Sequence, residues 1–205
     1  MIKNLLFDLG GVIMNIKREQ CVAAFQRLGM SDVDSFLGEY SQKGPFLRLE
    51  AGEITPSEFR DEVRQYISQE VSDADIDEAF CEFLVGIPRH RLEELRALRN
   101  HYRIYMLSNT NSIMWESRIA QEFRQEGLEM NDYFDGIVTS FEAKSIKPDS
   151  RIFEYAIEKC QLNPGETVFI DDSLANLEAS SKLGFKTLHI APGEEFAVKI
   201  ANEIN

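Results

Sequence analysis

The second half of the chain alternates short apolar segments with amphipathic helical patterns, and this alternation constrains the fold more than any other feature. The apolar segments lie at 103–108, 136–140, 167–171 and 187–190. The helical patterns lie at 91–100, 149–162 and 174–183, with a less regular helical stretch at 111–130. Short buried strands that alternate with helices are typical of an α/β fold with a doubly wound parallel sheet.

One further apolar segment opens the chain, and a region of different character separates it from the others. Residues 3–9 form an apolar run that reaches Asp8 and is followed by Gly10, as in a buried strand that ends in a tight turn. From about 15 to 90 the apolar residues recur three and four apart, and no segment there is convincing as a strand. We therefore predict an α/β core, residues 1–14 and 91–205, with an inserted all-helical cap, residues 15–90.

Two helix ends carry recognisable capping residues. Thr55 precedes Pro56 and is followed three positions later by Glu58, an arrangement that predicts the start of a helix. Gly184 directly follows the helical pattern at 174–183 and is expected to end that helix, because glycine readily adopts the left-handed conformation found after helices.

Charge and cysteine content exclude several classes of protein. The 205 residues carry a formal net charge of −13, which argues against binding nucleic acid through a broad basic face. The apolar runs are too short to span a bilayer, and Asp8 interrupts the one at the N-terminus, so neither an anchor nor a signal peptide is expected. The few, widely spaced cysteines fit a reducing compartment. We therefore expect a cytoplasmic protein with no nucleic-acid or membrane partner.

Polar and charged residues gather after the predicted strands, where open α/β sheets bind their ligands. The set comprises Asp8, Ser108, Asn109, Thr110, Lys147, Asp171, Asp172 and Ser173. Carboxylates held close together raise one another's pKa, and Mg²⁺ relieves this conflict because it prefers hard oxygen ligands. An aspartate can also act as a nucleophile toward a phosphoryl group. The residues by themselves thus indicate a site for a divalent cation and a phosphate ester.

Four short motifs in this set resemble those of the haloacid dehalogenase-like superfamily, in the same order along the chain. They are Asp8-Leu9-Gly10-Gly11-Val12, Ser108-Asn109-Thr110, Lys147-Pro148 and Asp171-Asp172. The resemblance covers essentially the whole chain, because this superfamily inserts its helical cap where residues 15–90 lie. The motifs are similar to those of the subgroup that contains bacterial α-D-glucose-1-phosphate phosphatase.

The resemblance implies how these residues would share the work of phosphate transfer. Asp8 would attack phosphorus, and Lys147 would neutralise both Asp8 and the phosphate. Ser108 would donate its hydroxyl to the phosphate, assisted by the backbone N–H of Asn109. Phosphoryl transfer depends mainly on such positioning and charge neutralisation.

The resemblance also implies a magnesium site built around Asp8. The backbone carbonyl of Gly10 and the carboxylate of Asp171 would complete the protein ligands. Asp172 would hold a bound water or Lys147. Asn176 either orients one of these two aspartates or is an ordinary surface residue.

One residue departs from the superfamily pattern, which has a second aspartate two positions after the nucleophile as general acid and base. Here that position is Gly10. Such acid–base help contributes about 10²–10⁴-fold in rate. The subgroup named above shares the glycine, so activity is still expected, and the proton could come from a bound water, Asn15 or a cap residue.

The expected function is Mg²⁺-dependent hydrolysis of a small phosphorylated metabolite, preferably a sugar phosphate, through an aspartyl-phosphate on Asp8. Within the cap, the stretch at 44–53 is expected to reach the site, which makes Phe46 and Arg48 candidates for substrate specificity. Two alternatives stay open: a catalytically weak binding or regulatory protein, and a metal-independent 2-haloacid dehalogenase. The sequence predicts neither the physiological substrate nor the oligomeric state.

Overall fold

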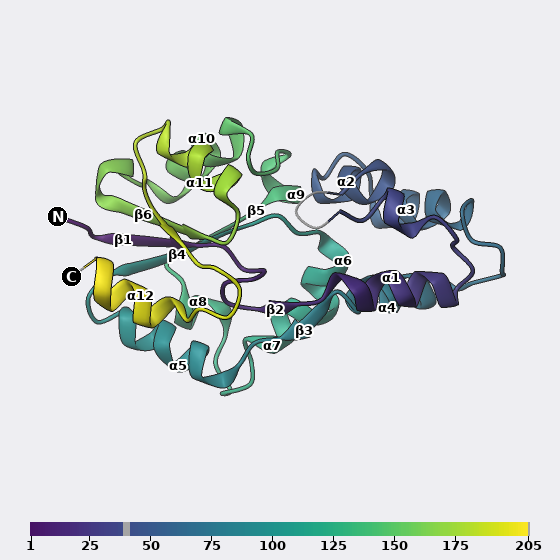
Figure 1. Cartoon of the computed structure of the whole chain (residues 1–205), viewed down its shortest axis with the longest axis horizontal. Helices are drawn as coiled ribbons and strands as arrows, with labels where there is room; N and C mark the ends of the chain where they lie inside the picture. The colour runs from purple at the N-terminus through teal and green to yellow at the C-terminus, as the bar shows by residue number, and fades with distance from the viewer. Residues whose placement is uncertain (39–41, 205) are drawn as a thin grey trace.

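A five-stranded parallel sheet forms the centre of the protein, as the computed structural model shows for residues 1–38 and 42–204 (Figure 1). In sheet order its strands are β5 (Gly136–Thr139), β4 (Arg103–Ser108), β1 (Asn4–Phe7), β6 (Thr167–Asp171) and β7 (Lys186–His189). Each adjacent pair is parallel. The doubly wound sheet predicted from the sequence is therefore confirmed, and β4 and β6 have the predicted bounds.

Helices cover both faces of this sheet because alternate residues of each strand point to opposite sides. Leu5 and Phe7 of β1 belong to one apolar cluster, whereas Leu6 belongs to a second one across the sheet. The first cluster includes residues of α5 (Arg89–Leu98), α8 (Met130–Tyr133) and α12 (Phe196–Glu203). The second includes residues of α10 (Ser150–Cys160) and α11 (Leu174–Ser181). Figure 1 shows the two groups of helices on opposite sides of the strands.

Between β1 and α5 the chain leaves the core and forms a second, mainly helical unit (Figure 1). Its helices are α1 (Arg18–Arg27), α2 (Gly44–Glu50), α3 (Pro56–Arg64) and α4 (Asp73–Cys81), with a 3-10 turn at Val33–Ser35. Four fully buried phenylalanines form its centre, with ring contacts between neighbours: Phe25, Phe46, Phe59 and Phe80.

This cap is not all-helical, because two short strands lie at its base. β2 (Asn15–Ile16) pairs antiparallel with β3 (Leu84–Gly86), so both connections between core and cap pass through one small ladder. The prediction that residues 15–90 contain no strand was therefore wrong. Strands of two and three residues are too short to show the alternation of apolar and polar residues by which a strand is recognised.

The remaining segments are short, and they include the stretch that looked irregular in the sequence. Residues 111–130 contain α6 (Ser112–Met114), a π-helical turn (Trp115–Ile119) and α7 (Ala120–Glu122). α9 (Ser140–Ala143) follows β5, and a 3-10 turn at Pro164–Glu166 precedes β6. Among the described residues, no helix has the length and apolar character needed to cross a membrane.

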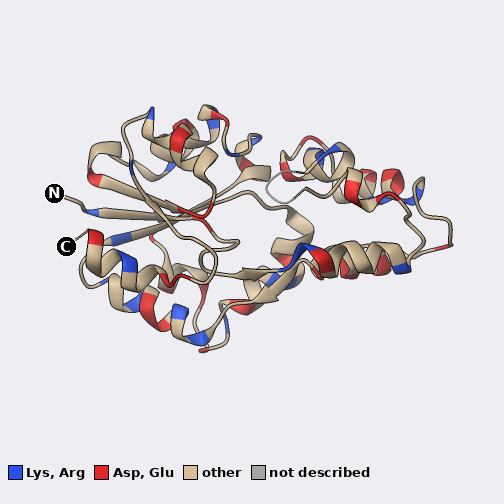
Figure 2. Ribbon diagram, viewed as in Figure 1, with Lys and Arg blue, Asp and Glu red and all other residues tan. Residues whose placement is uncertain are grey.

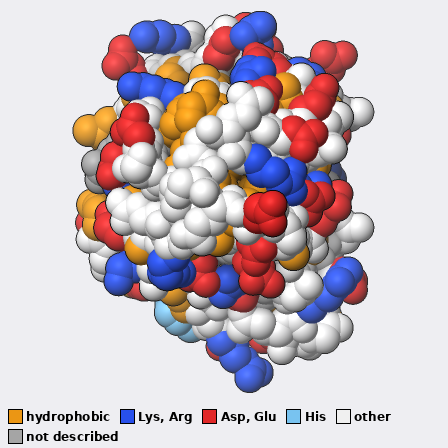
Figure 3. All heavy atoms as spheres, turned by 90° about the vertical axis from the view of Figure 1, so that its right-hand side faces the viewer, with side chains coloured by type: hydrophobic (Ala, Val, Ile, Leu, Met, Phe, Trp, Pro, Cys, Tyr) orange, Lys and Arg blue, Asp and Glu red, His pale blue; other side chains and the backbone are white. Residues whose placement is uncertain are grey.

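Acidic and basic residues are interspersed along the helices of both units (Figure 2). Figure 3, which views the molecule from the cap end, shows Lys and Arg beside Asp and Glu rather than one continuous basic patch on that face.

The two helix ends predicted from capping residues are confirmed. Thr55 and Glu58 form a reciprocal capping box, and Gly184 has a φ of +91° just beyond α11.

The capping box of α3 gives the first testable prediction. Thr55→Ala removes the side-chain oxygen that accepts the Glu58 N–H, and should lower the free energy of unfolding by about 1 kcal/mol in urea titrations. Ser57→Ala, at an exposed position in the same helix, is the matched control and should change stability by less than about 0.5 kcal/mol. Equal effects of the two substitutions would contradict a stabilising cap at Thr55.

Candidate active site

A cavity of about 110 Å³ lies at the carboxyl ends of the central strands, where the sequence predicts the site. Nine of the residues singled out in the sequence line it: Asp8, Gly10, Ser108, Asn109, Thr110, Lys147, Asp172, Ser173 and Asn176. The linker and the cap contribute Met14, Ile16, Gln42, Glu50, Phe83 and Leu84. The cavity thus lies between the core and the cap and has room for several water molecules or a small ligand.

Parallel pairing of the central strands brings the carboxylates together. β1 lies between β4 and β6, and the pairing continues one residue past β1, where the Asp8 N–H donates to the Ile170 carbonyl at 2.8 Å. Asp171 ends β6 and Asp172 follows it. One oxygen from each of Asp8, Asp171 and Asp172 lies within 4.8 Å of the others.

Lys147 is the one cationic side chain among the described residues that line this cavity, and it is bonded to two of the three carboxylates. Its Nζ lies 2.7 Å from Asp8 Oδ1 and 2.7 Å from Asp171 Oδ2. Only 3% of Lys147 is exposed. Burial alone would lower the pKa of this ammonium, but Asp171 and Asp8 outweigh it and raise the pKa of Lys147 above its usual value.

The carboxylates remain in excess even with Lys147 charged. Burial raises the pKa of Asp8 to about 7; Lys147 acts against this shift, while Asp171 and Asp172 add to it. Burial, and then the charge of Asp171, also raises the pKa of Asp172. The three carboxylates, two of them buried, offer the hard oxygen donors that Mg²⁺ prefers.

Asp171 and Asp172 differ in their access to the cavity. Asp171 is fully buried, and its oxygens accept from Lys147 Nζ, Asn176 Nδ2 and the Ser173 N–H. Asp172 is partly buried and lines the cavity. Asn176 therefore orients Asp171, one of the two possibilities left open by the sequence.

Asn109 holds Lys147 in position through its side chain, a contact that the sequence did not predict. Asn109 Nδ2 donates to the Lys147 carbonyl at 3.0 Å, and the Lys147 N–H donates to Asn109 Oδ1 at 2.8 Å. Ser108, the last residue of β4, is buried and lines the cavity beside it. The amide side chain thus connects the end of β4 to the loop that carries Lys147.

The two glycines after Leu9 differ in whether the surrounding structure requires a glycine. Gly11 has a φ of +80°, and a Cβ there would lie 2.3 Å from Asp172 Oδ2, so a side chain would displace the carboxylate. A Cβ at Gly10 would meet only the Ile16 side chain, at 3.5 Å, which is ordinary contact. The backbone therefore requires glycine at 11 but has room for a side chain at 10.

The cap residues expected to set specificity do not reach the cavity. Phe46 is fully buried among the aromatic rings of the cap, and Arg48 forms an ion pair with Glu62. The geometry gives no support to a specificity role for either residue. The stretch at 44–53 does reach the cavity, but through Glu50. The sequence did not single out Glu50, because a lone acidic residue at the end of a mostly apolar helix carries no distinguishing pattern.

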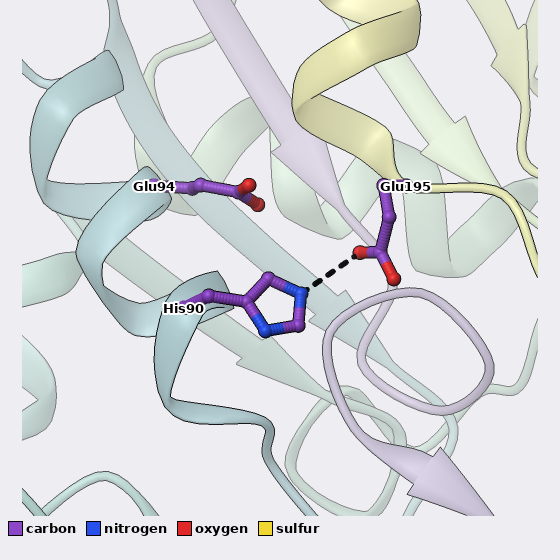
Figure 4. A group of neighbouring side chains, drawn as sticks. All are labelled: His90, Glu94 and Glu195. Carbon is purple, nitrogen blue, oxygen red and sulfur yellow. Dashed lines mark hydrogen bonds and ion pairs between the residues drawn. The ribbon is translucent and has the colours of Figure 1, made fainter.

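A second acidic group lies away from this cavity. His90 and Glu94 extend from α5 toward Glu195, which precedes α12 (Figure 4). His90 Nε2 lies 3.3 Å from Glu195 Oε2, while the Arg91 guanidinium contacts both Glu195 oxygens, at 2.9 and 3.2 Å. Arg91 also donates to the Ile13 carbonyl and Asn15 Oδ1. Arg91 thus neutralises Glu195. Through these hydrogen bonds it connects α5 to the start of α12 and to the start of the cap.

A family model of haloacid dehalogenase-like hydrolases matches residues 2–184, nearly the whole of the chain described above. The chain belongs to this family and is an enzyme, a hydrolase, as the four motifs predicted. 

Similar proteins indicate that the kind of hydrolase is a phosphatase. The D-ribitol-5-phosphate phosphatase of Bacteroides thetaiotaomicron is 34% identical over 205 residues, all of both chains. The crystal structure of a family enzyme from the same organism, in complex with magnesium and inorganic phosphate, matches with a TM-score of 0.89 and 40% identity, covering 96% of this chain and 98% of that one. A hydrolase structure of the family from Porphyromonas gingivalis matches with a TM-score of 0.92 and 33% identity, covering 100% and 98%.

The contact between Gly11 and Asp172 gives a second prediction. Gly11→Ala should lower the unfolding free energy by more than about 2 kcal/mol, since it adds backbone strain and a clash with the carboxylate. Gly193→Ala is the matched control, because Gly193 has a φ of +84° with nothing within 4 Å of its Cβ position, so only the strain of about 1–2 kcal/mol applies. Urea unfolding of both variants measures the difference, and equal losses would contradict the contact with Asp172.

Proposed function

We propose that this enzyme is a Mg²⁺-dependent phosphatase that hydrolyses a small phosphorylated sugar or sugar alcohol. The observation that carries the proposal is Asp8 itself, a carboxylate held by Lys147 beside two further carboxylates at a cavity between the core and the cap. A full-length relative that acts on D-ribitol 5-phosphate supports the substrate class. The small cavity under the cap supports a metabolite rather than a phosphoprotein, and the cytoplasmic location stays a prediction from the sequence.

The metal site proposed here differs in one residue from the assignment made from the sequence. Asp8, the backbone carbonyl of Gly10 and Asp172 would bind Mg²⁺, because Asp172 lines the cavity. Asp171, whose two oxygens are taken by Lys147, Asn176 and Ser173, would instead fix Lys147. Bound Mg²⁺ supplies positive charge that offsets the repulsion between an anionic nucleophile and an anionic substrate.

The proposed reaction proceeds in two steps on Asp8. In the first, an Asp8 oxygen forms a bond to phosphorus as the ester P–O bond breaks, and the departing alkoxide takes up a proton. In the second, water attacks the phosphorus of the aspartyl-phosphate, which releases inorganic phosphate and restores Asp8. Lys147, Ser108 and the Asn109 N–H would bind the phosphate oxygens throughout, and the cap would exclude bulk water.

The third prediction tests Asp8 and the cation together. Wild-type enzyme should release phosphate from D-ribitol 5-phosphate in the presence of Mg²⁺ and lose this activity with EDTA. Asp8→Asn should reduce kcat by more than about 10³-fold, because an amide is a poor nucleophile. Asp61→Asn, the same change at an exposed cap position, should leave kcat unchanged.

Other results would favour the alternative functions. Phosphate release by Asp8→Asn at the wild-type rate would exclude the aspartyl-phosphate. Chloride release from 2-chloropropionate that persists in EDTA would indicate a dehalogenase. Binding of Mg²⁺ and tungstate without turnover of any phosphate ester in a metabolite panel would indicate a binding protein.

A further inference from the structure

The proposed first step leaves an alkoxide that needs a proton, and among the described residues no acidic side chain on the core side of the cavity is free to supply one. Gly10 has no side chain at all. Asn15, considered above as a donor, does not line the cavity, and its Oδ1 accepts from Arg91. Among the described residues of the cavity wall, the titratable side chains are Asp8, Lys147, Asp172 and Glu50.

The first three of these side chains are already committed. Asp8 is the proposed nucleophile, and Lys147 is bonded to both Asp8 and Asp171. Asp172 belongs to the three-carboxylate cluster that would hold the cation. Glu50 is the one that remains, and it belongs to the cap.

Glu50 lies where the cap meets the core. It is the last residue of α2, and α2 packs against α9. Two residues further on, the Gly52 carbonyl accepts from Lys144 Nζ at 2.5 Å, and a Cβ on Gly52 would lie 2.2 Å from the Phe141 carbonyl oxygen. This close contact holds the end of α2 against the core at the cavity.

The position on the cap suits a group that acts on the leaving oxygen. In phosphoryl transfer the attacking and leaving oxygens lie roughly in line on opposite sides of phosphorus. Asp8 attacks from the floor formed by the sheet, so the leaving oxygen departs toward the cap, the side of the cavity on which Glu50 lies.

The Glu50 carboxyl is also free to give up a proton. No hydrogen bond or ion pair joins it to any residue in the described part of the chain. Burial raises its pKa to about 8. Asp8, Lys147 and Asp172 face the same cavity and Lys144 lies nearby on the core, but burial is the only cause of the shift.

We propose that Glu50 is the general acid of this enzyme, donating its proton to the alkoxide oxygen as the ester bond to phosphorus breaks. The resulting Glu50 carboxylate then accepts a proton from the water that attacks the aspartyl-phosphate, so the carboxyl is regenerated in each turnover. This inference rests on the proposed phosphatase function. It assigns to the cap a task that the core residue at position 10 cannot perform.

The fourth prediction compares two leaving groups. Glu50→Gln should lower kcat/KM for D-ribitol 5-phosphate by about 10²–10⁴-fold, because an alkoxide needs the proton. For p-nitrophenyl phosphate, whose phenolate leaves without protonation, kcat/KM should fall less than about tenfold. This parameter covers the steps up to departure of the leaving group, so it is not affected by the later hydrolysis. Glu53→Gln, an exposed position three residues away, is the matched control and should change neither value.

The pH profile provides a second readout. With D-ribitol 5-phosphate, kcat/KM of the wild type should fall as pH rises through about 8, because the protonated form of Glu50 is the active one. Glu50→Gln should lose this alkaline limb, while Glu50→Asp should keep a limb at altered pH.

Position 10 offers a test by rescue, since the structure has room for a side chain there. Gly10→Asp in the Glu50→Gln background should restore at least about tenfold of the lost kcat/KM for the alkyl ester by placing a carboxyl on the core side. A rescue would also show that Glu50→Gln folds normally.

Three outcomes would overturn part or all of this proposal. Equal losses for both esters, or a rise in KM alone, would assign Glu50 to substrate binding or structure and leave the phosphatase function intact. An unchanged Glu50→Gln variant would exclude any role for Glu50 while the wild type still turned over. Absence of phosphate release by the wild type from both esters would overturn the phosphatase function itself.

Discussion

The ammonium of Lys147, buried between Asp8 and Asp171, is the interaction on which the site depends. Buried charges are costly unless they are paired, and this one is paired twice, at 2.7 Å in each case. The pairing requires β1 and β6 to be neighbours and the loop after α9 to return to the end of β4, where Asn109 fixes it. The order of the strands, the path of the loop and the carboxylate cluster are therefore all needed to pair this one buried charge.

The core was predictable from the sequence because its signals are strong and local. β4 and β6 are continuous apolar runs with polar residues at their ends, and this pattern determines both the strand and the position of Asp171. Asp8, Lys147 and Asp171 then converge because parallel strands share one carboxyl edge. The start of α3 was equally predictable, since the capping box at Thr55 is recognised from residue types and their spacing alone.

The features that escaped prediction depend on contacts between distant segments. The β2–β3 pair is too short to carry a period, and the different access of Asp171 and Asp172 follows from donors on Lys147 and Asn176. Phe46 and Glu50 are four residues apart in one helix, yet the first is in the cap interior and the second on the cavity wall. Which of them faces the cavity depends on how α2 packs against α9, and the sequence of α2 does not contain this information.

The Arg91 guanidinium gives the C-terminal helix a part in how the two units are joined. It bonds to Ile13 and Asn15, where the chain enters the cap, and to Glu195, directly before α12. The family model ends at residue 184 and so does not include this last helix. A chain cut before Glu195 would nevertheless leave a nearly buried guanidinium without its counter-charge at the root of the cap. The C-terminal segment of the core thus stabilises the junction between the two units, and the fit of the cap over the cavity depends in part on Glu195.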